Sequence, residues 1–348
     1  MRIAFVVNRI ETEGSDYATS TLATAAILRG HDVYITEVGD LTYLENGHLS
    51  ISAVQVSNGK IKNVANYLKL LHSDDTPMVK VTSQDLDVIF LRNNPCEDYG
   101  DRPWATTAGM IFGQIAMTQG VLVVNDPFIM MTSFNKMYFQ HFPEEVRPKT
   151  IITRDAEEIK DFYKKQKEKI ILKPLQGSGG KDVFLIDSST NMNQIVETIS
   201  RYDYIIAQEY LPAAKDGDIR VIMMNGKILT VKGKPALLHR VNKSDDIRSN
   251  ISVGGTGQKA QYTDDIKRLC NIIGPKLKAD GMFLVGVDIV GDKIMELNLE
   301  SPGGLVSMEK LENEKFSAHV IMALEKKIEY KQYYDGRLPN AFLATLEL

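Results

Sequence analysis

The chain has few cysteines, no long hydrophobic run and no large excess of either charge. Its two cysteines, Cys96 and Cys270, lie far apart and form no CxxC pair, which argues against a disulfide framework or a zinc site. The six histidines show no HExxH spacing. No run approaches the roughly 18 apolar residues of a membrane span, and no signal-peptide pattern follows Met1. We therefore expect a soluble cytoplasmic protein with no membrane partner.

The charge balance also limits which binding partners can be expected. The 348 residues include 41 Lys plus Arg and 45 Asp plus Glu, for a net charge of −4. There is no global field to attract nucleic acid, so the basic residues must act locally. With 43% hydrophobic and 25% charged residues the composition is globular, and the length suggests two or three domains.

The first part of the chain alternates strand and helix. Patterns of apolar residues predict strands at 3–7, 31–37, 86–91 and 121–124 and helices at 15–28 and 104–118. This order indicates a small parallel sheet covered by helices. The first strand runs into Asn8-Arg9 with no GxGxxG turn, so NAD binding is unlikely on these residues. Asn46-Gly47 and Asn58-Gly59 are hairpin signals between these elements.

Beyond Pro127 the pattern becomes α+β. Asp155 and Glu158 form a capping-box pattern for a helix that runs through Lys164. Further strands are predicted at 170–173, 183–187, 204–210 and 221–224, with helices at 193–201 and 264–279 and a long polar loop at 242–257.

A short hairpin at residues 283–298 carries the most informative polar side chains. Glu296 and Asn298 are two apart on one strand and face the same side, and Asp288 comes from the neighbouring strand. Oxygen donors with no His or Cys nearby suit Mg²⁺, which shares its shell with substrate phosphates. The residues alone fit equally well a hairpin with a polar, solvated face.

A glycine-rich turn follows the strand that ends at Lys173. Gly177-Ser178-Gly179-Gly180 lets backbone N–H groups approach a phosphate without a Cβ in the way, and the lysine can reach phosphate oxygens. It is not a Walker A loop, which leads into a helix. A plain turn between two strands is the alternative.

Arginines and a second glycine-rich segment surround the long loop. Arg220, Arg240 and Arg248 could bind anionic groups in bidentate fashion or could be solvated surface residues. Residues 249–257 have the composition of a mobile lid or of a surface loop. No Ser-His-Asp or Cys-His arrangement is suggested, and phosphoryl transfer by positioning and electrostatics needs none.

Taken in order, these motifs resemble bacterial glutathione synthetase, a member of the ATP-grasp superfamily. The resemblance runs from residue 1 to about residue 325. Besides the segments above it rests on Lys136, Ile171-Leu172-Lys173-Pro174-Leu175, Ala207-Gln208-Glu209-Tyr210-Leu211-Pro212-Ala213, Lys215-Asp216-Gly217-Asp218-Ile219-Arg220-Val221, Arg248-Ser249-Asn250, Gly254-Gly255-Thr256-Gly257 and Ser301-Pro302.

The resemblance implies a fold class of α/β and α+β, with an ATP-grasp fold preceded by a small parallel α/β domain. The implied domains are an N-terminal domain at 1–126, an ATP-grasp lid subdomain at 127–210, a catalytic subdomain at 211–330 with a substrate lid loop at 241–256, and a tail at 331–348. A homo-oligomer is expected for such enzymes.

It also implies roles for individual residues. ATP would be bound by Lys136, Lys173, Gly177, Ser178, Gly179, Gly180, Gln208, Glu209, Tyr210 and Leu211. The catalytic residues would be Arg220, Arg248 and Asn250, and the peptide would be bound by Arg92, Asp218, Arg240 and Arg248. Asp288, Glu296 and Asn298 would hold two Mg²⁺ ions, with Mn²⁺ as an alternative.

The implied reaction joins γ-glutamylcysteine and glycine with ATP, through an acyl phosphate, to give glutathione, ADP and phosphate. The chain departs from the family pattern at Asn93-Asn94, Asn135-Lys136 and Gly303-Gly304-Leu305. The first and last of these lie where substrate carboxylates would bind, so an ATP-grasp ligase for a different peptide or amino-acid pair stays open as an alternative. A second alternative is a nucleotide-binding regulatory protein without turnover, against which the presence of all three metal ligands and both lysines argues.

Overall fold

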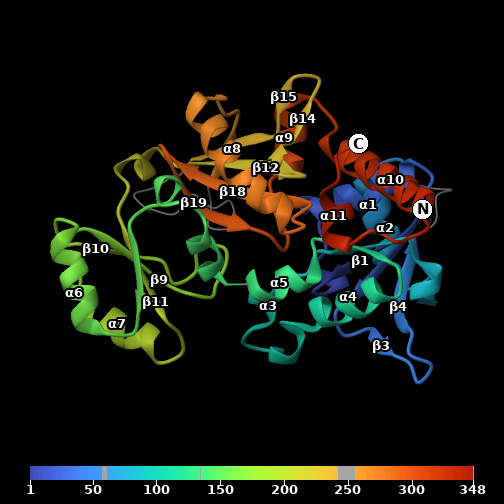
Figure 1. The fold of residues 1–348 in the computed structure, drawn as a ribbon, viewed down its shortest axis with the longest axis horizontal. Coiled ribbons are helices and arrows are strands. Elements are labelled where there is room, and N and C mark those ends of the chain that lie inside the picture. The colour runs from blue at the N-terminus through green and yellow to red at the C-terminus, as the bar shows by residue number, and fades with distance from the viewer. Residues whose placement is uncertain (57–60, 134, 242–254, 348) are drawn as a thin grey trace.

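The computed structural model describes residues 1–56, 61–133, 135–241 and 255–347. Within them the strands form three larger sheets and one two-stranded sheet. Figure 1 shows the first sheet and its helices on the right, the four-stranded sheet on the left and the six-stranded sheet above and between them. No helix in these ranges is long and apolar enough to cross a membrane.

The first sheet has a parallel centre extended by antiparallel strands. Its order is β3-β4-β2-β1-β6-β7, with β5 paired to β4. The parallel strands agree with the predicted ones, whereas the antiparallel strands were signalled only by Asn46-Gly47, whose glycine has φ +86°. Asn58-Gly59 lies outside the described residues. The strands are β1 (Arg2–Val7), β2 (Asp32–Glu37), β3 (Leu41–Tyr43), β4 (Leu49–Val56), β5 (Met78–Thr82), β6 (Val88–Leu91) and β7 (Leu122–Val124).

Helices enclose this sheet because its strands are apolar on both faces. One face packs against the layer that contains α1 and α2, and the other against the layer that contains α4. Phe5 and Phe90 stack on the first face with ring centroids 5.7 Å apart. The helices are α1 (Ala18–Leu28), α2 (Val64–Leu71), α3 (Pro95–Asp98), α4 (Ala108–Thr118) and α5 (Pro127–Ser133).

The second sheet is antiparallel, with the order β10-β9-β11-β8. Two amphipathic helices cover one face and bury Ile159 and Ile199 against it. Asp155 accepts hydrogen bonds from the backbone of Glu157 and Glu158, so the expected N-cap is present. The Asp155 backbone N–H donates to Thr153 Oγ1 instead of Glu158, so the reciprocal half of the predicted capping box does not form. The elements are β8 (Thr150–Thr153), α6 (Ala156–Lys165), β9 (Ile170–Pro174), β10 (Phe184–Ile186), α7 (Met192–Ser200) and β11 (Ile205–Glu209).

The third sheet is also antiparallel, with the order β17-β16-β12-β18-β19 and β13 paired to β12. Helix α8 packs on one face, and β14 and β15 form a separate ribbon. The elements are β12 (Asp218–Met224), β13 (Lys227–Ile228), β14 (Thr230–Val231), β15 (Lys234–Pro235), β16 (Leu237–Val241), β17 (Thr256–Gln258), α8 (Asp264–Ala279), β18 (Leu284–Val290) and β19 (Lys293–Asn298).

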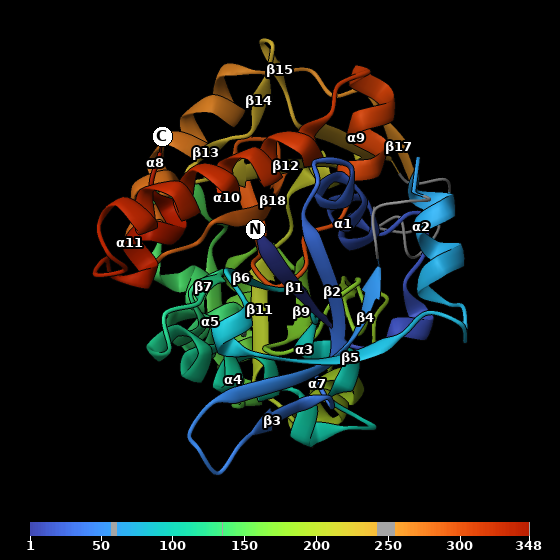
Figure 2. The ribbon, with the colours of Figure 1, turned by 90° about the vertical axis from the view of Figure 1, so that its right-hand side faces the viewer.

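The last part of the chain returns to the first sheet. Helices α9 (Leu305–Glu312), α10 (Phe316–Tyr333) and α11 (Asn340–Thr345) follow the third sheet, and Figure 2 shows α10 and α11 beside the first sheet. The Asn340 side chain exchanges two hydrogen bonds of 2.9 Å with the backbone of Val123. The segment after residue 330, uninformative as sequence, therefore caps the edge strand β7.

Candidate active site

One face of the third sheet carries charged side chains, while the other face is apolar. Because side chains alternate along a strand, Asp218, Arg220 and Asp288 share one face, and intervening residues such as Val221 pack toward α8. The strand register aligns Asp218 with Arg240 on β16 and Arg220 with Asp288. Neighbouring strands thus place opposite charges side by side.

A β-bulge in the β18–β19 hairpin adds a residue to this face. Asp288 pairs with Glu296, whereas Ile289 pairs with Ile294, so Met295 is the extra residue. Both Met295 and Glu296 consequently line the same cleft. The hairpin brings Glu296 opposite Asp288, as its sequence suggests.

Asp288 lies buried between two guanidinium groups. Arg220 binds it with both Nε and Nη2, the latter at 2.9 Å, and Arg240 Nη2 lies 2.8 Å from Asp288 Oδ2. Arg240 also binds both carboxylate oxygens of Asp218. Burial alone would raise the pKa of Asp288, but the two arginines outweigh it and hold that pKa well below its usual range. The buried charges are therefore balanced within one network.

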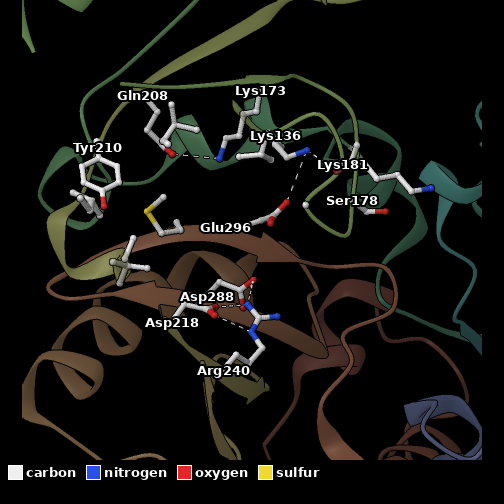
Figure 3. Close-up of a pocket in the computed structure, with 18 of the residues that line it drawn as sticks. Lys136, Lys173, Ser178, Lys181, Gln208, Tyr210, Asp218, Arg240, Asp288 and Glu296 are labelled. Carbon is white, nitrogen blue, oxygen red and sulfur yellow. Dashed lines mark hydrogen bonds and ion pairs between the residues drawn. The ribbon is translucent and has the colours of Figure 1, made fainter. Parts of the chain in front are cut away.

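The opposite wall of the cleft carries two lysines (Figure 3). Lys173, on β9, donates to Gln208 Oε1 on β11 over 3.3 Å. Lys136 donates to the Gly177 carbonyl over 2.5 Å and lies 3.9 Å from Glu296 Oε1. Burial lowers the pKa of Lys173 to about 8, an effect that the charge of Glu296 opposes. The two lysines face only one carboxylate, that of Glu296. This wall of the cleft is therefore suited to an anionic ligand.

The glycine-rich turn between β9 and β10 adopts a backbone that favours glycine. Gly177, Gly179 and Gly180 have φ of +141°, +66° and +76°. The turn reaches the first part of the chain, since Asn94 Nδ2 donates to Ser178 Oγ over 3.2 Å. Gly177, Ser178 and Gly180 of this turn line the same cleft as the lysines.

The cleft has an apolar end and a charged end. It encloses a cavity of about 130 Å³ whose apolar lining includes Ile171, Val183 and Val290. In Figure 3, Tyr210 lies at one end, and Lys181 lies at the other. An apolar slot that leads to lysines and a glycine-rich turn fits a purine base followed by phosphates.

The hard oxygen donors here fit a magnesium ion that relies partly on phosphate. The described residues hold no group of three His, Cys, Asp or Glu side chains placed for a metal. Asp288 and Glu296 are the two carboxylates, and Asn298 Nδ2 lies 3.3 Å from Asp288 Oδ2, so the amide is adjacent. Mg²⁺ commonly uses one or two carboxylates together with waters and phosphate oxygens. The donor set agrees with that pattern.

Most residues expected from the sequence meet at this cleft. Arg220 and Asn298 adjoin it through Asp288. The expected residues that line it are Lys136, Lys173, Gly177, Ser178, Gly180, Gln208, Tyr210, Leu211, Asp218, Arg240, Asp288 and Glu296.

The remaining expected residues lie elsewhere. Glu209 accepts from the backbone N–H of Lys149 over 2.7 Å, and its own backbone N–H donates to the Lys149 carbonyl over 2.9 Å, so this residue is paired with the chain beside β11 and does not line the cleft. Gly179 belongs to the glycine-rich turn, and Arg92 lies at the end of β6 near Pro302. Arg248 and Asn250, with most of the expected lid loop, lie outside the described residues.

Lys181, Met295 and Glu300 were missed in the sequence, besides apolar lining residues such as Val183 and Val290. Lys181 and Met295 line the cleft, the latter because of the bulge, which no local pattern signals. Glu300 lies close enough to Glu296 for their charges to interact, and burial raises the pKa of Glu300 to about 7. The spacing 296, 298, 300 was the available signal for Glu300.

Two antiparallel sheets that enclose a cleft, with lysines on one wall and carboxylates on the other, define an ATP-grasp protein. The solved structure of D-cycloserine synthetase DcsG has this fold: it matches with a TM-score of 0.59 at 12% identity over 93% of this chain and 99% of its own. The ATP-grasp ligase PsnB, bound to a minimal precursor, Mg and ADP, matches with a TM-score of 0.58 at 15% identity, over 94% and 97%. At these identities the likeness concerns the fold alone.

The chain belongs to the prokaryotic glutathione synthetase family. The N-terminal domain of that family matches residues 1–130 and its ATP-grasp domain residues 135–313. The glutathione synthetase of Buchnera aphidicola subsp. Schizaphis graminum is 33% identical over 308 residues, covering 86% of this chain and 88% of the relative. That of Escherichia coli (strain K12) is 32% identical over 304 residues, covering 86% and 90%.

The protein is thus an ATP-dependent ligase of the glutathione synthetase type. The fold class and the family expected from the motifs are both confirmed. Neither alternative, a ligase for another pair of substrates or a regulatory protein without turnover, is favoured by these matches.

Proposed function

We propose that the protein joins γ-glutamylcysteine to glycine with ATP. The cysteinyl carboxylate attacks the γ-phosphorus and displaces ADP, giving an acyl phosphate. The amine of glycine then attacks the acyl carbon, loses a proton, and displaces phosphate to leave glutathione. The family match across both domains carries this proposal.

The cleft supplies the electrostatics for the first step. Lys136 and Lys173, which line the cleft, would bind phosphate oxygens, and the backbone N–H groups of the glycine-rich turn would bind them as well. Tyr210 and Leu211, at the apolar end, would contact the base. Phosphoryl transfer needs little more from a protein than positioning and charge neutralisation.

Arg220 would act in the second step. Its guanidinium is fixed by Asp288 and by the Gly303 carbonyl, which accepts from Nη1 over 3.2 Å. A fixed guanidinium beside the phosphate site would stabilise the acyl phosphate and the negative charge that develops on the tetrahedral carbon. Arg248, Asn250 and the lid at 241–256 are proposed to complete the site and exclude water.

Asp288, Glu296 and Asn298 are proposed to hold Mg²⁺, in two ions as in the family resemblance, with Mn²⁺ as an alternative. Bound there, the metal would neutralise charge on the phosphates of ATP. Asp288 is ionised because of its arginines, whose guanidinium groups occupy its oxygens, whereas Glu296 has one lysine contact at 3.9 Å and is the carboxylate freer to bind a cation. A cytoplasmic location and a homo-oligomeric state form part of the same proposal.

A phosphate-release assay tests the substrate pair. The purified protein is incubated with Mg·ATP and γ-glutamylcysteine, with other dipeptides, and with glycine or other amino acids as acceptors, and products are identified by mass. We expect glutathione from γ-glutamylcysteine and glycine, in amounts equal to the phosphate released. A higher rate with another dipeptide or acceptor would contradict the proposed pair.

A further inference from the structure

A second cavity lies where the third sheet meets α10. Its volume is about 410 Å³, compared with about 130 Å³ at the active cleft, and the two share no lining residue. Strand β12 contributes Asp218 to the cleft and Met224, at its other end, to this cavity. The remaining lining comes from β13, from α10, which belongs to the core of the first sheet, and from the segment after α11. The cavity is thus built from parts of the chain that are distant in sequence.

Asn225 provides a buried donor at this cavity. It lines the cavity and is 7% exposed. Its Oδ1 accepts a hydrogen bond of 3.1 Å from Lys327 Nζ, which leaves the amide nitrogen Nδ2 as the free end of the side chain. Nδ2 has no hydrogen-bond partner among the residues that the structure describes. A buried N–H without a protein partner points to a ligand that supplies an acceptor.

The charges around the cavity favour an anion. Lys227 and Lys326 both line it, and Glu347 is the one carboxylate among its described lining residues. Glu347 Oε1 lies 2.7 Å from Lys227 Nζ, but the two side chains are 48% and 70% exposed, so solvent screens the pair and it is weak. A carboxylate is therefore accepted at Lys227, and an incoming anion would compete with Glu347 for it.

A further cation lies behind Asn225. Lys327 Nζ donates to Asn225 Oδ1 and to the Leu346 carbonyl, both of which belong to residues that line the cavity. These acceptors are neutral, and the charge of Glu347 acts on Lys327 without forming an ion pair in the described part of the chain. An anion in the cavity would stabilise the ammonium form of Lys327 across the Asn225 amide.

Much of the remaining lining is apolar. Ile228 and Leu229 contribute from the third sheet, Met322 from α10, and Leu346 from the segment after α11. An inorganic anion would leave this surface in contact with water, whereas a ligand with a hydrocarbon chain would bury it. A mostly apolar cavity with a few polar groups at fixed positions is typical of small-molecule sites.

We propose that this cavity is a second ligand site, which binds a small organic carboxylate. The carboxylate accepts from Asn225 Nδ2 and from the ammonium groups of Lys227 and Lys326, and the hydrocarbon chain lies against Ile228 and Met322. The ligand contacts β12 and α10 together, so its binding stabilises the junction between the third sheet and the helix that packs on the first. This site is separate from the proposed ligase reaction and does not depend on it.

Calorimetry with the intact protein tests the site, with Mg·ADP and γ-glutamylcysteine present so that the active cleft is not available to the probe. The probes are hexanoate, acetate and hexanamide. We expect one hexanoate per chain, with a dissociation constant of about 1 mM or lower. Acetate lacks the hydrocarbon chain and hexanamide lacks the charge, so each should bind at least about tenfold more weakly. At ten times its dissociation constant, hexanoate should lower the unfolding equilibrium constant about tenfold.

Two variants of lining residues should change the affinity in opposite directions. Asn225→Asp keeps an oxygen for Lys327 and tolerates the left-handed backbone at φ +55°, but replaces the donor by an acceptor, so hexanoate should bind at least about tenfold more weakly. Glu347→Gln removes the competing carboxylate and should tighten binding about threefold. The control is Asn193→Asp, the same change at an exposed position of α7, which should leave hexanoate binding unchanged.

The contrary results are equally definite. The site would be overturned if hexanoate did not bind at ten times the expected dissociation constant, if hexanamide bound as tightly, or if Asn225→Asp bound hexanoate like the wild type. Should Asn225→Asp not fold, Ala323→Trp decides, because it fills the cavity from α10, and hexanoate binding retained in that protein would refute the assignment. None of these measurements reads ligation, so their failure leaves the proposed function untouched.

Discussion

At the scale of single residues, the two carboxylates of the proposed metal site, Asp288 and Glu296, differ in their partners. Asp288 is held by Arg220 and Arg240, whereas Glu296 has only the 3.9 Å contact with Lys136. Glu296 is therefore the carboxylate best able to give its oxygens to a cation. Asp288, which lies opposite Glu296 in the hairpin, serves first to fix Arg220 and Arg240.

Glu296→Gln should reduce ligation by about 100-fold or more, because it removes negative charge from the proposed metal site. Calorimetry should also show that ADP binding no longer strengthens when Mg²⁺ is added. The control is Asp292→Asn in the exposed turn of the same hairpin, which should behave as the wild type. Ligation at the wild-type rate, with Mg²⁺-dependent ADP binding intact, would refute the metal assignment.

Nucleotide binding should be coupled to protonation of the Lys173 amine. Its pKa is lowered to about 8, so part of the population is neutral at pH 8 to 9 in the unliganded protein. Bound phosphates favour the ammonium form, and ADP binding at pH 8.5 should therefore take up protons. Calorimetry in buffers of different ionisation enthalpy measures this uptake. Lys173→Arg should bind ADP without it, and equal uptake in both proteins would show that another group titrates.

At the scale of secondary-structure elements, α8 and the turn after β12 approach unusually closely. A Cβ on Gly274, in α8, would lie 2.1 Å from the carbonyl oxygen of Gly226. Replacing a helical glycine by alanine normally stabilises a helix by up to about 1 kcal/mol. Here the clash is with backbone, which cannot move away as a flexible side chain can.

Gly274→Ala should therefore lower the free energy of unfolding, by about 1–3 kcal/mol, because overpacking outweighs the gain in helix propensity. Chemical denaturation measures the difference. Gly100→Ala is the control, since a Cβ there meets no atom within 4 Å. A more stable Gly274→Ala protein would mean that the helix and turn can separate without loss.

Most elements of the fold were predictable because their signals are local. The alternating strands, the Asp155 cap and the Gly291-Asp292 turn are each encoded within a few residues. The charge network around Asp288 could not be predicted in this way, because it depends on the register of β16, β12 and β18, which are strands distant in the sequence. The bulge at Met295 and the unpaired Nη1 of Arg92 are likewise properties of packing.

At the scale of the whole molecule, the C-terminal helices join the first and third sheets. The core that surrounds β1 also includes Leu284 of β18 and Ile321 of α10. Thr345 donates to the Lys278 carbonyl over 2.9 Å, which ties α11 to the end of α8. The N-terminal and ATP-grasp parts therefore share one apolar core through helices that lie beyond the matched family domains.

Lys327 lies at the centre of this junction. It is 1% exposed, donates to Asn225 Oδ1 over 3.1 Å and to the Leu346 carbonyl, and lies 5.3 Å from the centroid of the Phe283 ring. Burial, assisted by the charge of Lys278, lowers the pKa of Lys327 to about 7. The interior thus favours the neutral amine.

This gives the stability of the whole molecule a definite pH dependence. Between about pH 7 and the ordinary lysine pKa of 10.5, the unfolded chain holds a proton that folded Lys327 has released. Because the unfolded state binds more protons, this group makes the free energy of unfolding rise with pH, by up to about 1.4 kcal/mol per unit.

Lys327→Met should remove that slope, whatever its effect on absolute stability, since the two acceptors of Lys327 lose their donor. Denaturation at pH 7.5, 8.5 and 9.5 measures the slope in both proteins, and their difference cancels the other titrating groups. Lys326→Met, which alters the exposed neighbour, should keep the wild-type slope. Identical slopes in the wild-type and Lys327→Met proteins would show that Lys327 remains protonated in the core, held by Asn225 and the Leu346 carbonyl.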